Sequence, residues 1–171
     1  DKAKEELGNL KSSASSTFQQ VRDFIFDLRP MMLDDLGLVP TVKRYMDAFK
    51  EKSTMEVTVN VVGKERRLES YVEVMIFRAI QELLNNASVH SQASQVKVQL
   101  DLLESDVKVV VEDNGKGFET GTIEDLETGI GLKLIRERVA MVNGAFEVDS
   151  KIGQGTRVSF VIPTAEKEVF A

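Results

Sequence analysis

The chain has 171 residues, of which 42% are hydrophobic and 29% charged, a composition and length typical of one globular domain with an appendage. The formal net charge of −6 argues against nucleic-acid binding as the main function. The lack of cysteine excludes disulfides and thiolate metal sites, and a single histidine cannot build a zinc site. No apolar run approaches the roughly eighteen residues of a membrane span, and no signal-peptide pattern is present, so we expect a cytoplasmic protein.

Residues 1–29 carry a heptad repeat, which predicts one long helix with a coiled-coil seam. The seam positions are Leu7, Leu10, Ala14, Thr17, Val21, Phe24 and Leu28. Pro30 ends the helix. Such a stripe needs a partner, so we expect it to pair with another copy of the chain, with an upstream segment, or with both. The alternative is a lone amphipathic helix that packs on its own domain.

Residues 30–40 predict a hinge, because Pro30, Gly37 and Pro40 interrupt any regular element there. A short helix is expected next, over residues 41–50. Its apolar side consists of Val42, Tyr45, Met46 and Phe49.

The pattern that follows predicts a two-layer α+β sandwich, with helices on one face of a mixed, mostly antiparallel sheet. Strands are expected over 55–62, 95–103, 107–112, 145–151 and 157–162, and helices over 71–89 and 132–142. In the first strand Val57, Val59 and Val61 should face inward, and in the second Val96, Val98 and Leu100. Residues 118–128 hold four acids and few apolar side chains, which predicts a mobile loop, and the tail from residue 163 should be loose.

The two helices have recognisable starts, faces and ends. A capping box of Ser70 and Glu73 should begin helix 71–89, and Asn143-Gly144 should end helix 132–142. The first apolar stripe consists of Val72, Ile76, Ala79, Ile80, Leu83 and Ala87. The second consists of Leu134, Ile135, Val139 and Met141.

Glu82 and Asn86 lie one turn apart on the first of these helices, so their side chains share a flank. A carboxylate beside a carboxamide can hold a hydrated magnesium ion, because a hard cation prefers oxygen ligands and keeps several waters. The simpler interpretation of the pair is a solvated helix face.

Four segments in a fixed order favour the functional interpretation. They are Gln81–His90, Asp113-Asn114-Gly115-Lys116-Gly117, Gly129-Ile130-Gly131-Leu132 and Gly153-Gln154-Gly155-Thr156. In this order they resemble the N, G1, G2 and G3 boxes of the GHKL ATPases, the superfamily of DNA gyrase, the large heat-shock chaperone, MutL and the histidine kinases. The resemblance implies the Bergerat fold, with ATP and Mg2+ as cofactors.

The Leu-Arg-Pro…Leu-Asp-Asp-Leu-Gly-Leu string of residues 28–38 resembles one branch of sensor histidine kinases, those partnered with NarL-type response regulators, and is closest to the DegS-type kinases. This resemblance implies a second dimerisation helix over 1–29 (partial), a linker over 30–40, an ATP-binding catalytic domain over 41–163 and a tail over 164–171. It also implies a homodimer formed through residues 1–29 with the upstream dimerisation helix.

The position of Asp113 at a strand end suits a carboxylate that accepts from the exocyclic amine of adenine, where guanine would present a carbonyl. Gly115 and Gly117 let the backbone pass close to the base, and the Thr156 hydroxyl can bond the ring through a water. The turn at 129–131 opens a helix whose N–H groups can face phosphates, with Lys133 and Arg136 adding charge.

By analogy with the family, Asn86 should hold magnesium, Glu82 should act as general base or orient the nucleophile, and Asn85 should assist. The residues expected to contact nucleotide or metal are Asn85, Asn86, His90, Asp113, Gly115, Lys116, Gly117, Gly129, Ile130, Gly131, Leu132, Arg136 and Thr156.

Two departures from the kinase pattern stand out. Val89 occupies a position where many histidine kinases have lysine, and His90, the only histidine, belongs to the nucleotide site rather than to a phospho-acceptor helix. We therefore expect a kinase catalytic module whose acceptor histidine lies on a first dimerisation helix absent from this chain. The alternatives are another GHKL enzyme (an anti-sigma-type serine kinase or a conformational ATPase) and a non-enzymatic dimerisation module.

Overall fold

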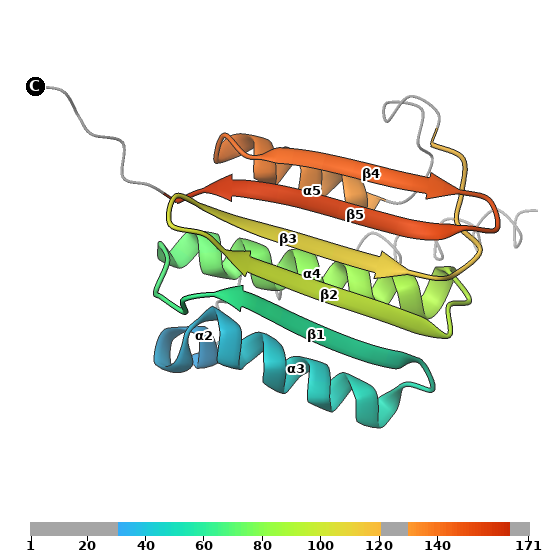
Figure 1. The fold of residues 1–171 in the computed structure, drawn as a ribbon, viewed down its shortest axis with the longest axis horizontal. Helices are drawn as coiled ribbons and strands as arrows, with labels where there is room; N and C mark the ends of the chain where they lie inside the picture. The colour runs from blue at the N-terminus through green and yellow to red at the C-terminus, as the bar shows by residue number, and fades with distance from the viewer. Residues whose placement is uncertain (1–30, 121–129, 165–171) are drawn as a thin grey trace, which may run out of the picture. The chain divides into compact units, whose positions relative to one another are not determined.

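The computed structural model describes residues 31–120 and 130–164. Its elements are α2 (Met31–Leu36), α3 (Leu38–Lys52), β1 (Glu56–Gly63), α4 (Ser70–His90), β2 (Gln95–Leu102), β3 (Asp106–Asp113), α5 (Ile130–Met141), β4 (Ala145–Lys151) and β5 (Gly155–Pro163) (Figure 1). The chain divides into two compact units, residues 1–31 and 32–171, and only the second is described below. The predicted helix over 1–29, Gly129, most of the predicted loop 118–128 and the tail from residue 165 lie outside the described residues.

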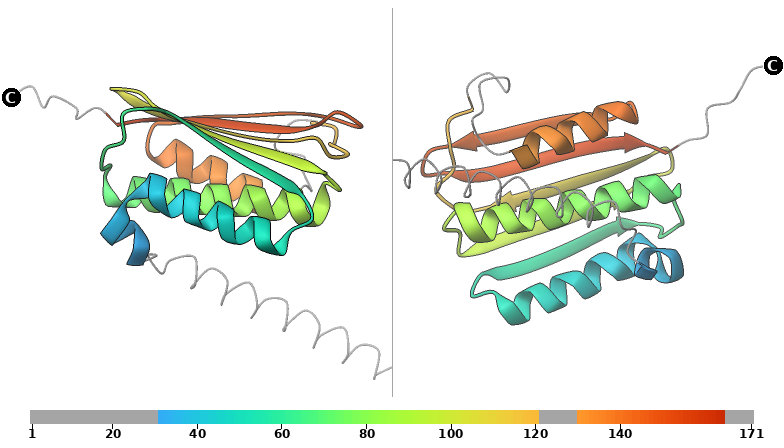
Figure 2. Two further views of the ribbon diagram at one scale, coloured as in Figure 1. Left: turned by 60° about the horizontal axis from the view of Figure 1, so that its bottom comes forward. Right: turned by 180° about the vertical axis from the view of Figure 1, so that it is seen from behind.

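The five strands form one sheet in the order β1-β2-β3-β5-β4. The β1 and β2 strands run parallel, and every other neighbouring pair is antiparallel. Helices α3, α4 and α5 cover one face of the sheet: α3 packs on β1, α4 on β2 and β3, and α5 on β4 and β5 (Figure 2). The predicted two-layer α+β sandwich with a mixed sheet is therefore confirmed.

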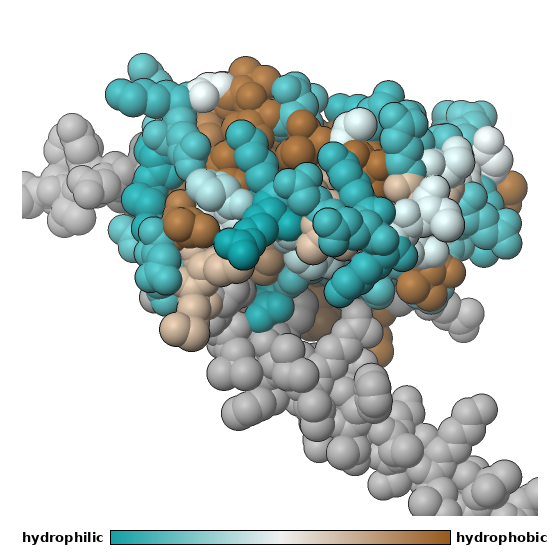
Figure 3. All heavy atoms as spheres, turned by 90° about the horizontal axis from the view of Figure 1, so that it is seen from below, coloured by the Kyte–Doolittle hydropathy of each residue, from teal (hydrophilic) through white to brown (hydrophobic). Residues whose placement is uncertain are grey.

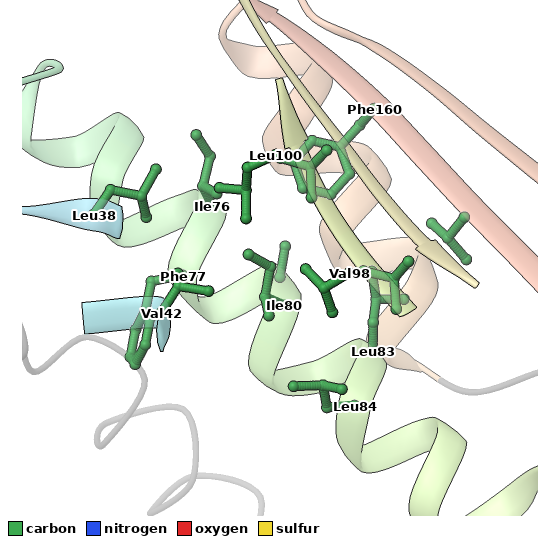
Figure 4. Close-up of a cluster of buried hydrophobic side chains, with 14 of the residues drawn as sticks. Leu38, Val42, Ile76, Phe77, Ile80, Leu83, Leu84, Val98, Leu100 and Phe160 are labelled. Carbon is green, nitrogen blue, oxygen red and sulfur yellow. The ribbon is translucent and has the colours of Figure 1, made fainter. Parts of the chain in front are cut away.

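The core lies between α4 and the sheet. Every residue of the predicted α4 stripe is buried, and Phe77 and Leu84 extend it. These side chains meet Val98 and Leu100 of β2 and Phe160 of β5 (Figure 4). Full burial of one such side chain contributes about 1.5–3 kcal/mol to the free energy of unfolding, so this layer fixes α4 on the sheet.

The segment predicted to be a hinge is mostly helical. Residues 31–36 form α2, and α3 begins at Leu38 and includes Pro40 in its first turn. Proline is tolerated there because the first N–H groups of a helix have no partner within the helix. The Thr41 hydroxyl donates to the Gly37 carbonyl at 2.7 Å and so links the first turn of α3 to the residue between the two helices.

The predicted capping box at the start of α4 is wrong. Glu69 is the N-cap residue, and the buried Ser70 hydroxyl has no hydrogen-bond partner in the described part of the chain. The fully buried Glu73 carboxylate instead accepts from the Leu68 N–H at 3.1 Å and from Arg67 at 3.1 and 3.2 Å. A buried carboxylate needs such a charged partner, and that requirement overrides the local capping pattern.

Arg67 also ties α2 to the domain. Its guanidinium donates to the carbonyls of Leu33 and Asp34, each at 3.0 Å, so the arginine caps the end of α2 while it pairs with Glu73. Leu33 itself is fully buried. Residues 32–36 are therefore packed onto the rest of their unit through Leu33 and Arg67.

Helix α5 begins at Ile130 and buries Ile135 and Val139, as predicted, with Leu134 half-buried. Met141 was expected in the core but is 82% exposed, because it lies two residues beyond Val139 and so on the opposite side of the helix. The predicted C-cap is confirmed. Asn143 adopts φ 57, and the N–H groups of Asn143 and Gly144 bond the carbonyls of Ala140 and Val139.

The edge of the domain formed by α3 is mainly hydrophilic, with smaller hydrophobic areas between the polar side chains (Figure 3). Charged residues of α3 account for part of this surface: Lys43, Arg44, Asp47, Lys50 and Glu51 are exposed. Within residues 31–120 and 130–164, no helix has the length and apolar character that a membrane crossing requires.

Candidate functional site

The register of the sheet places three polar side chains in one row. Asp113 of β3 is paired with Thr156 of β5, and Thr156 is paired with Ser150 of β4. The next inward residues on β3 and β5, Val111 and Val158, are buried, so the row continues the helix-covered face to its end. The row thus forms a polar edge on an otherwise apolar face.

Asp113 lies half-buried at the end of β3. Its Oδ1 accepts from the Gly115 N–H at 2.8 Å. Burial raises the pKa of the Asp113 carboxyl above the ordinary aspartate value, while hydrogen bonds from the N–H groups of Gly115 and Thr156 counteract part of the rise. The ionised carboxylate is an acceptor in a partly desolvated place, which suits recognition of an amine.

The loop after β3 packs directly on the residue that follows α4. The Lys116 N–H donates to the Ser91 carbonyl at 2.7 Å, and a Cβ on Gly115 would collide with Ser91. The buried Ser91 hydroxyl donates to the Ala87 carbonyl at 2.6 Å and accepts from the Ala93 N–H at 3.0 Å. Gly115 therefore lets the first and second predicted segments touch.

The same loop is also bonded to the β4–β5 hairpin. The Lys116 carbonyl accepts from the Gly153 N–H at 2.6 Å, and the Phe118 N–H donates to the Ser150 hydroxyl at 3.0 Å. Gly117, which lies between these two bonds, adopts φ 59. The second and fourth predicted segments are thus joined by direct hydrogen bonds.

Glu82 connects the first segment to the third. A Cβ on Gly131 would collide with the Glu82 carboxylate, so that carboxylate lies against the first turn of α5. A negative charge is favourable at a helix N-terminus, where N–H groups lack partners. Asn86 lies one turn further along α4, on the same flank and half-buried. Glu82 and Asn86 therefore lie beside the predicted phosphate site.

The other predicted site residues differ in their exposure. Asn85, His90, Lys116, Ile130 and Arg136 are exposed, Leu132 packs against the core, and Gly129 is outside the described residues. Lys133 is on the first turn of α5, but Arg136 is six residues beyond Ile130, about 9 Å further along the helix axis. Of the two cations, Lys133 is therefore the better placed for a phosphate at this helix start.

A comparison with protein families decides what this arrangement is. Residues 71–166, more than half of the chain, match the family described as histidine kinase-, DNA gyrase B-, and HSP90-like ATPase. The chain belongs to this family. The matched residues include all four predicted segments, so the predicted superfamily is confirmed. The roles of the individual site residues stay predictions.

Similar curated proteins of this family are sensor kinases. The chain is 38% identical over 168 residues to the signal transduction histidine-protein kinase/phosphatase DegS of Brevibacillus brevis, covering 98% of this chain and 43% of that protein. It is 34% identical to the oxygen sensor histidine kinase NreB of Staphylococcus carnosus, covering 89% of this chain and 44% of NreB. The chain thus spans less than half the length of these relatives.

Solved histidine kinases share the fold. The blue-light activated histidine kinase EL346 of Erythrobacter litoralis superposes with a TM-score of 0.69 at 20% identity, covering 93% of this chain and 52% of that chain. The histidine kinase AdeS of Acinetobacter baumannii gives a TM-score of 0.63 at 14% identity, with 94% and 84% covered. At these identities the likeness concerns the fold alone.

The oxygen atoms available at this site suit a metal ion that is also bound by the phosphates of a nucleotide. In the described ranges no group of three or more His, Cys, Asp or Glu side chains can hold an ion alone. Asn86 offers a carboxamide oxygen and Glu82 a carboxylate, and magnesium is commonly bound by one or two protein oxygens together with substrate phosphates. The residues present therefore fit a magnesium ion that arrives with a nucleotide.

Sequence patterns missed two buried serines at the site. Ser91 and Ser150 were not among the predicted residues, although each contacts one that was. The clue to Ser91 was its place directly after His90, and the clue to Ser150 was its position one residue before the end of a predicted strand. Neither position could be interpreted without the sheet register.

Proposed function

We propose that this chain is the ATP-binding catalytic part of a sensor histidine kinase, which transfers the γ-phosphate of ATP to a histidine on a partner dimerisation helix. One observation carries the proposal: four segments spread over residues 81–156 converge at one end of the domain, between the second half of α4 and the first turn of α5. The identity to kinases such as DegS and NreB supports this member of the family over its other ATPases.

In this proposal Asp113 recognises the base. Its ionised carboxylate accepts from the exocyclic amine of adenine, and the half-buried Thr156 beside it offers a hydroxyl to the ring or to a bridging water. A 6-oxo base would present a carbonyl to the carboxylate, with two acceptors facing each other.

The phosphates lie at the start of α5 in the proposed complex. The N–H groups of Ile130, Gly131 and Leu132, which have no partner within the helix, face them, and Lys133 adds a positive charge. Bound magnesium would neutralise phosphate charge, with Asn86 as its ligand. Glu82 orients the nucleophile or accepts its proton. A histidine nucleophile needs only a weak base, because phosphoryl transfer depends mainly on positioning and charge neutralisation.

The remaining assignments in the proposal concern the longer protein. Residues 1–29 form the second dimerisation helix of a homodimer, 30–40 the linker, 41–163 the catalytic domain and 164–171 a tail. The phosphate passes from the acceptor histidine to a NarL-type response regulator in the cytoplasm. The packing of Leu33 and Arg67 supports a firm attachment of the linker to the catalytic domain.

The experiment is incubation of the chain with magnesium and γ-labelled ATP, alone and with an intact dimerisation helix pair in trans. The chain alone should bind ATP but carry no label, because His90 is its only histidine and lies in the nucleotide site. The added helices should gain acid-labile phosphate, as phosphohistidine does. Acid-stable phosphate would favour the serine kinase alternative. Acid-labile label on His90 itself would refute the assignment of roles.

A further inference from the structure

Ser150 is only 4% exposed. It lies on β4, at the end of the row formed by Asp113, Thr156 and Ser150. Within the described ranges, it is one of four buried polar or charged residues, together with Thr41, Glu73 and Ser91. Its hydroxyl has three neighbours. It accepts from the Phe118 N–H at 3.0 Å, it donates to the Gly155 carbonyl at 3.0 Å, and it lies 2.9 Å from the Thr156 hydroxyl.

By geometry alone either hydroxyl could donate in the third bond, and a count of protons assigns its direction. A serine hydroxyl has one proton and two lone pairs. The proton goes to the Gly155 carbonyl and one lone pair to the Phe118 N–H, which leaves one lone pair for Thr156. The Thr156 hydroxyl must therefore donate its own proton to Ser150. The lone pairs of the Thr156 oxygen then remain available to accept from a ligand.

The consequence is a row of acceptors at the predicted base site. Asp113 presents a carboxylate, and Thr156, held by Ser150, presents oxygen lone pairs beside it. Two adjacent acceptors favour a base that offers an amine at this position and disfavour one that offers a carbonyl. A threonine hydroxyl free to rotate would accept from an amine or donate to a carbonyl, and would discriminate less.

We propose that Ser150 is a positioning residue for base selection: by taking the proton of Thr156, it keeps that hydroxyl an acceptor and favours a 6-aminopurine over a 6-oxopurine. This inference rests on the proposed function, since it assumes that the base of a nucleotide lies against Asp113 and Thr156. It adds a specificity role to a residue of β4 that touches no nucleotide itself.

A purely structural role for Ser150 makes a different prediction. Removal of the hydroxyl also leaves the Phe118 N–H and the Gly155 carbonyl without this partner, which would lower stability and weaken every nucleotide equally. The positioning role alone changes the ratio between two nucleotides that differ at position 6 of the purine. That ratio is therefore the decisive quantity.

The test is a double-mutant cycle of Ser150→Ala, Thr156→Val and the combined variant, with titration calorimetry of ATP and of inosine triphosphate in magnesium. Ser150→Ala should weaken ATP binding about two- to tenfold, the worth of one neutral hydrogen bond, and lower the ATP-to-ITP affinity ratio by a similar factor. In the Thr156→Val background the same change should leave the ratio unaltered. Ser159→Ala, on the same strand as Thr156, is the matched control and should keep the parent's ratio.

Ser150→Thr retains the hydroxyl and should restore the ratio. If Ser150→Ala does not fold, Ser150→Cys, whose thiol fills the site but is only a weak hydrogen-bond acceptor, takes its place in the cycle. An unchanged ATP-to-ITP ratio, or equal effects of Ser150→Ala with and without Thr156, would overturn the inference and leave the proposed function standing. Failure of the parent chain to bind ATP would overturn the proposed function first.

Discussion

The charge of Asp113 is the sharpest test of the nucleotide site. In the variant Asp113→Asn the side-chain carbonyl must keep the place of Oδ1, because that atom accepts from the Gly115 N–H at 2.8 Å. The amide nitrogen then occupies the other position and presents a donor where the ionised carboxylate offered an acceptor. An adenine amine would meet a donor instead of a negative charge.

The expected loss follows from the bond removed. A hydrogen bond to a charged group is worth about 1.5–3 kcal/mol, which corresponds to roughly a ten- to hundredfold weaker affinity for ATP. Titration calorimetry of parent and variant with ATP and magnesium measures it. Asp106→Asn, at the opposite end of the same strand, is the control and should bind as the parent does.

The fold should survive this substitution. Because burial raises the pKa of Asp113, its contribution to stability is present below the ordinary aspartate pKa and is lost as the pH rises through the raised value. Removal of the charge at neutral pH relieves a desolvation penalty but weakens the bonds from the Gly115 and Thr156 N–H groups. Because these two effects oppose each other, the melting temperature without nucleotide should barely move. If Asp113→Asn binds ATP as tightly as the parent, the adenine assignment is wrong, and the kinase proposal fails with it.

Three further predictions concern the metal, the titration of the site and the linker. Asn86→Ala should weaken ATP binding mainly when magnesium is present, and an equal loss in EDTA would argue against a metal ligand. The pKa of the Asp113 carboxyl, measured by carbon NMR, should lie above the ordinary aspartate value. It should fall when an adenine nucleotide binds, because the amine of the base bonds the ionised form. A pKa that nucleotide leaves unchanged would place the base elsewhere. Arg67→Ala should cost about 3–5 kcal/mol in urea unfolding, because it leaves the buried Glu73 carboxylate without its cation, and a loss under 1 kcal/mol would contradict that pairing.

The sequence predicted the sheet and its helices well because their signals are local. The alternation in β1 and β2 and the three- and four-residue spacing in α4 report which face is buried: Val57, Val96, Val98 and Leu100 are buried, and Val59 and Val61 are half-buried against the core. In β3 the alternation is incomplete, because Val110 on the other face is buried as well. The prediction failed where a residue's conformation or contact depends on a partner that is distant in the sequence. Glu73 had a capping position in sequence but pairs with Arg67 in the fold, and Pro40 resembled a helix breaker but occupies a helix's first turn.

The candidate site shows the same limit. Asp113, Gly115 and Thr156 carry turn and strand-end patterns that the sequence displays directly. Ser150 has no pattern of its own, and its importance depends on the register that pairs it with Thr156. The contact between Glu82 and Gly131 likewise joins two helices and has no local signal. The resemblance to a family identified the four segments in the sequence, whereas the contacts between them are visible only in the packed structure.

Glu73 and Asn86 lie near opposite ends of α4, and the distance between them has a testable consequence. Glu73 holds Arg67 near the first turn, while Asn86 lies thirteen residues on, about 20 Å along the axis. Glu73 is the only charged residue that α4 buries. Charges act weakly over such a distance, since the Debye length is about 8 Å at physiological salt. Arg67→Ala should therefore lower stability but leave the ATP-to-ITP affinity ratio unchanged. A changed ratio in that variant would mean that α4 transmits strain from the linker to the nucleotide site.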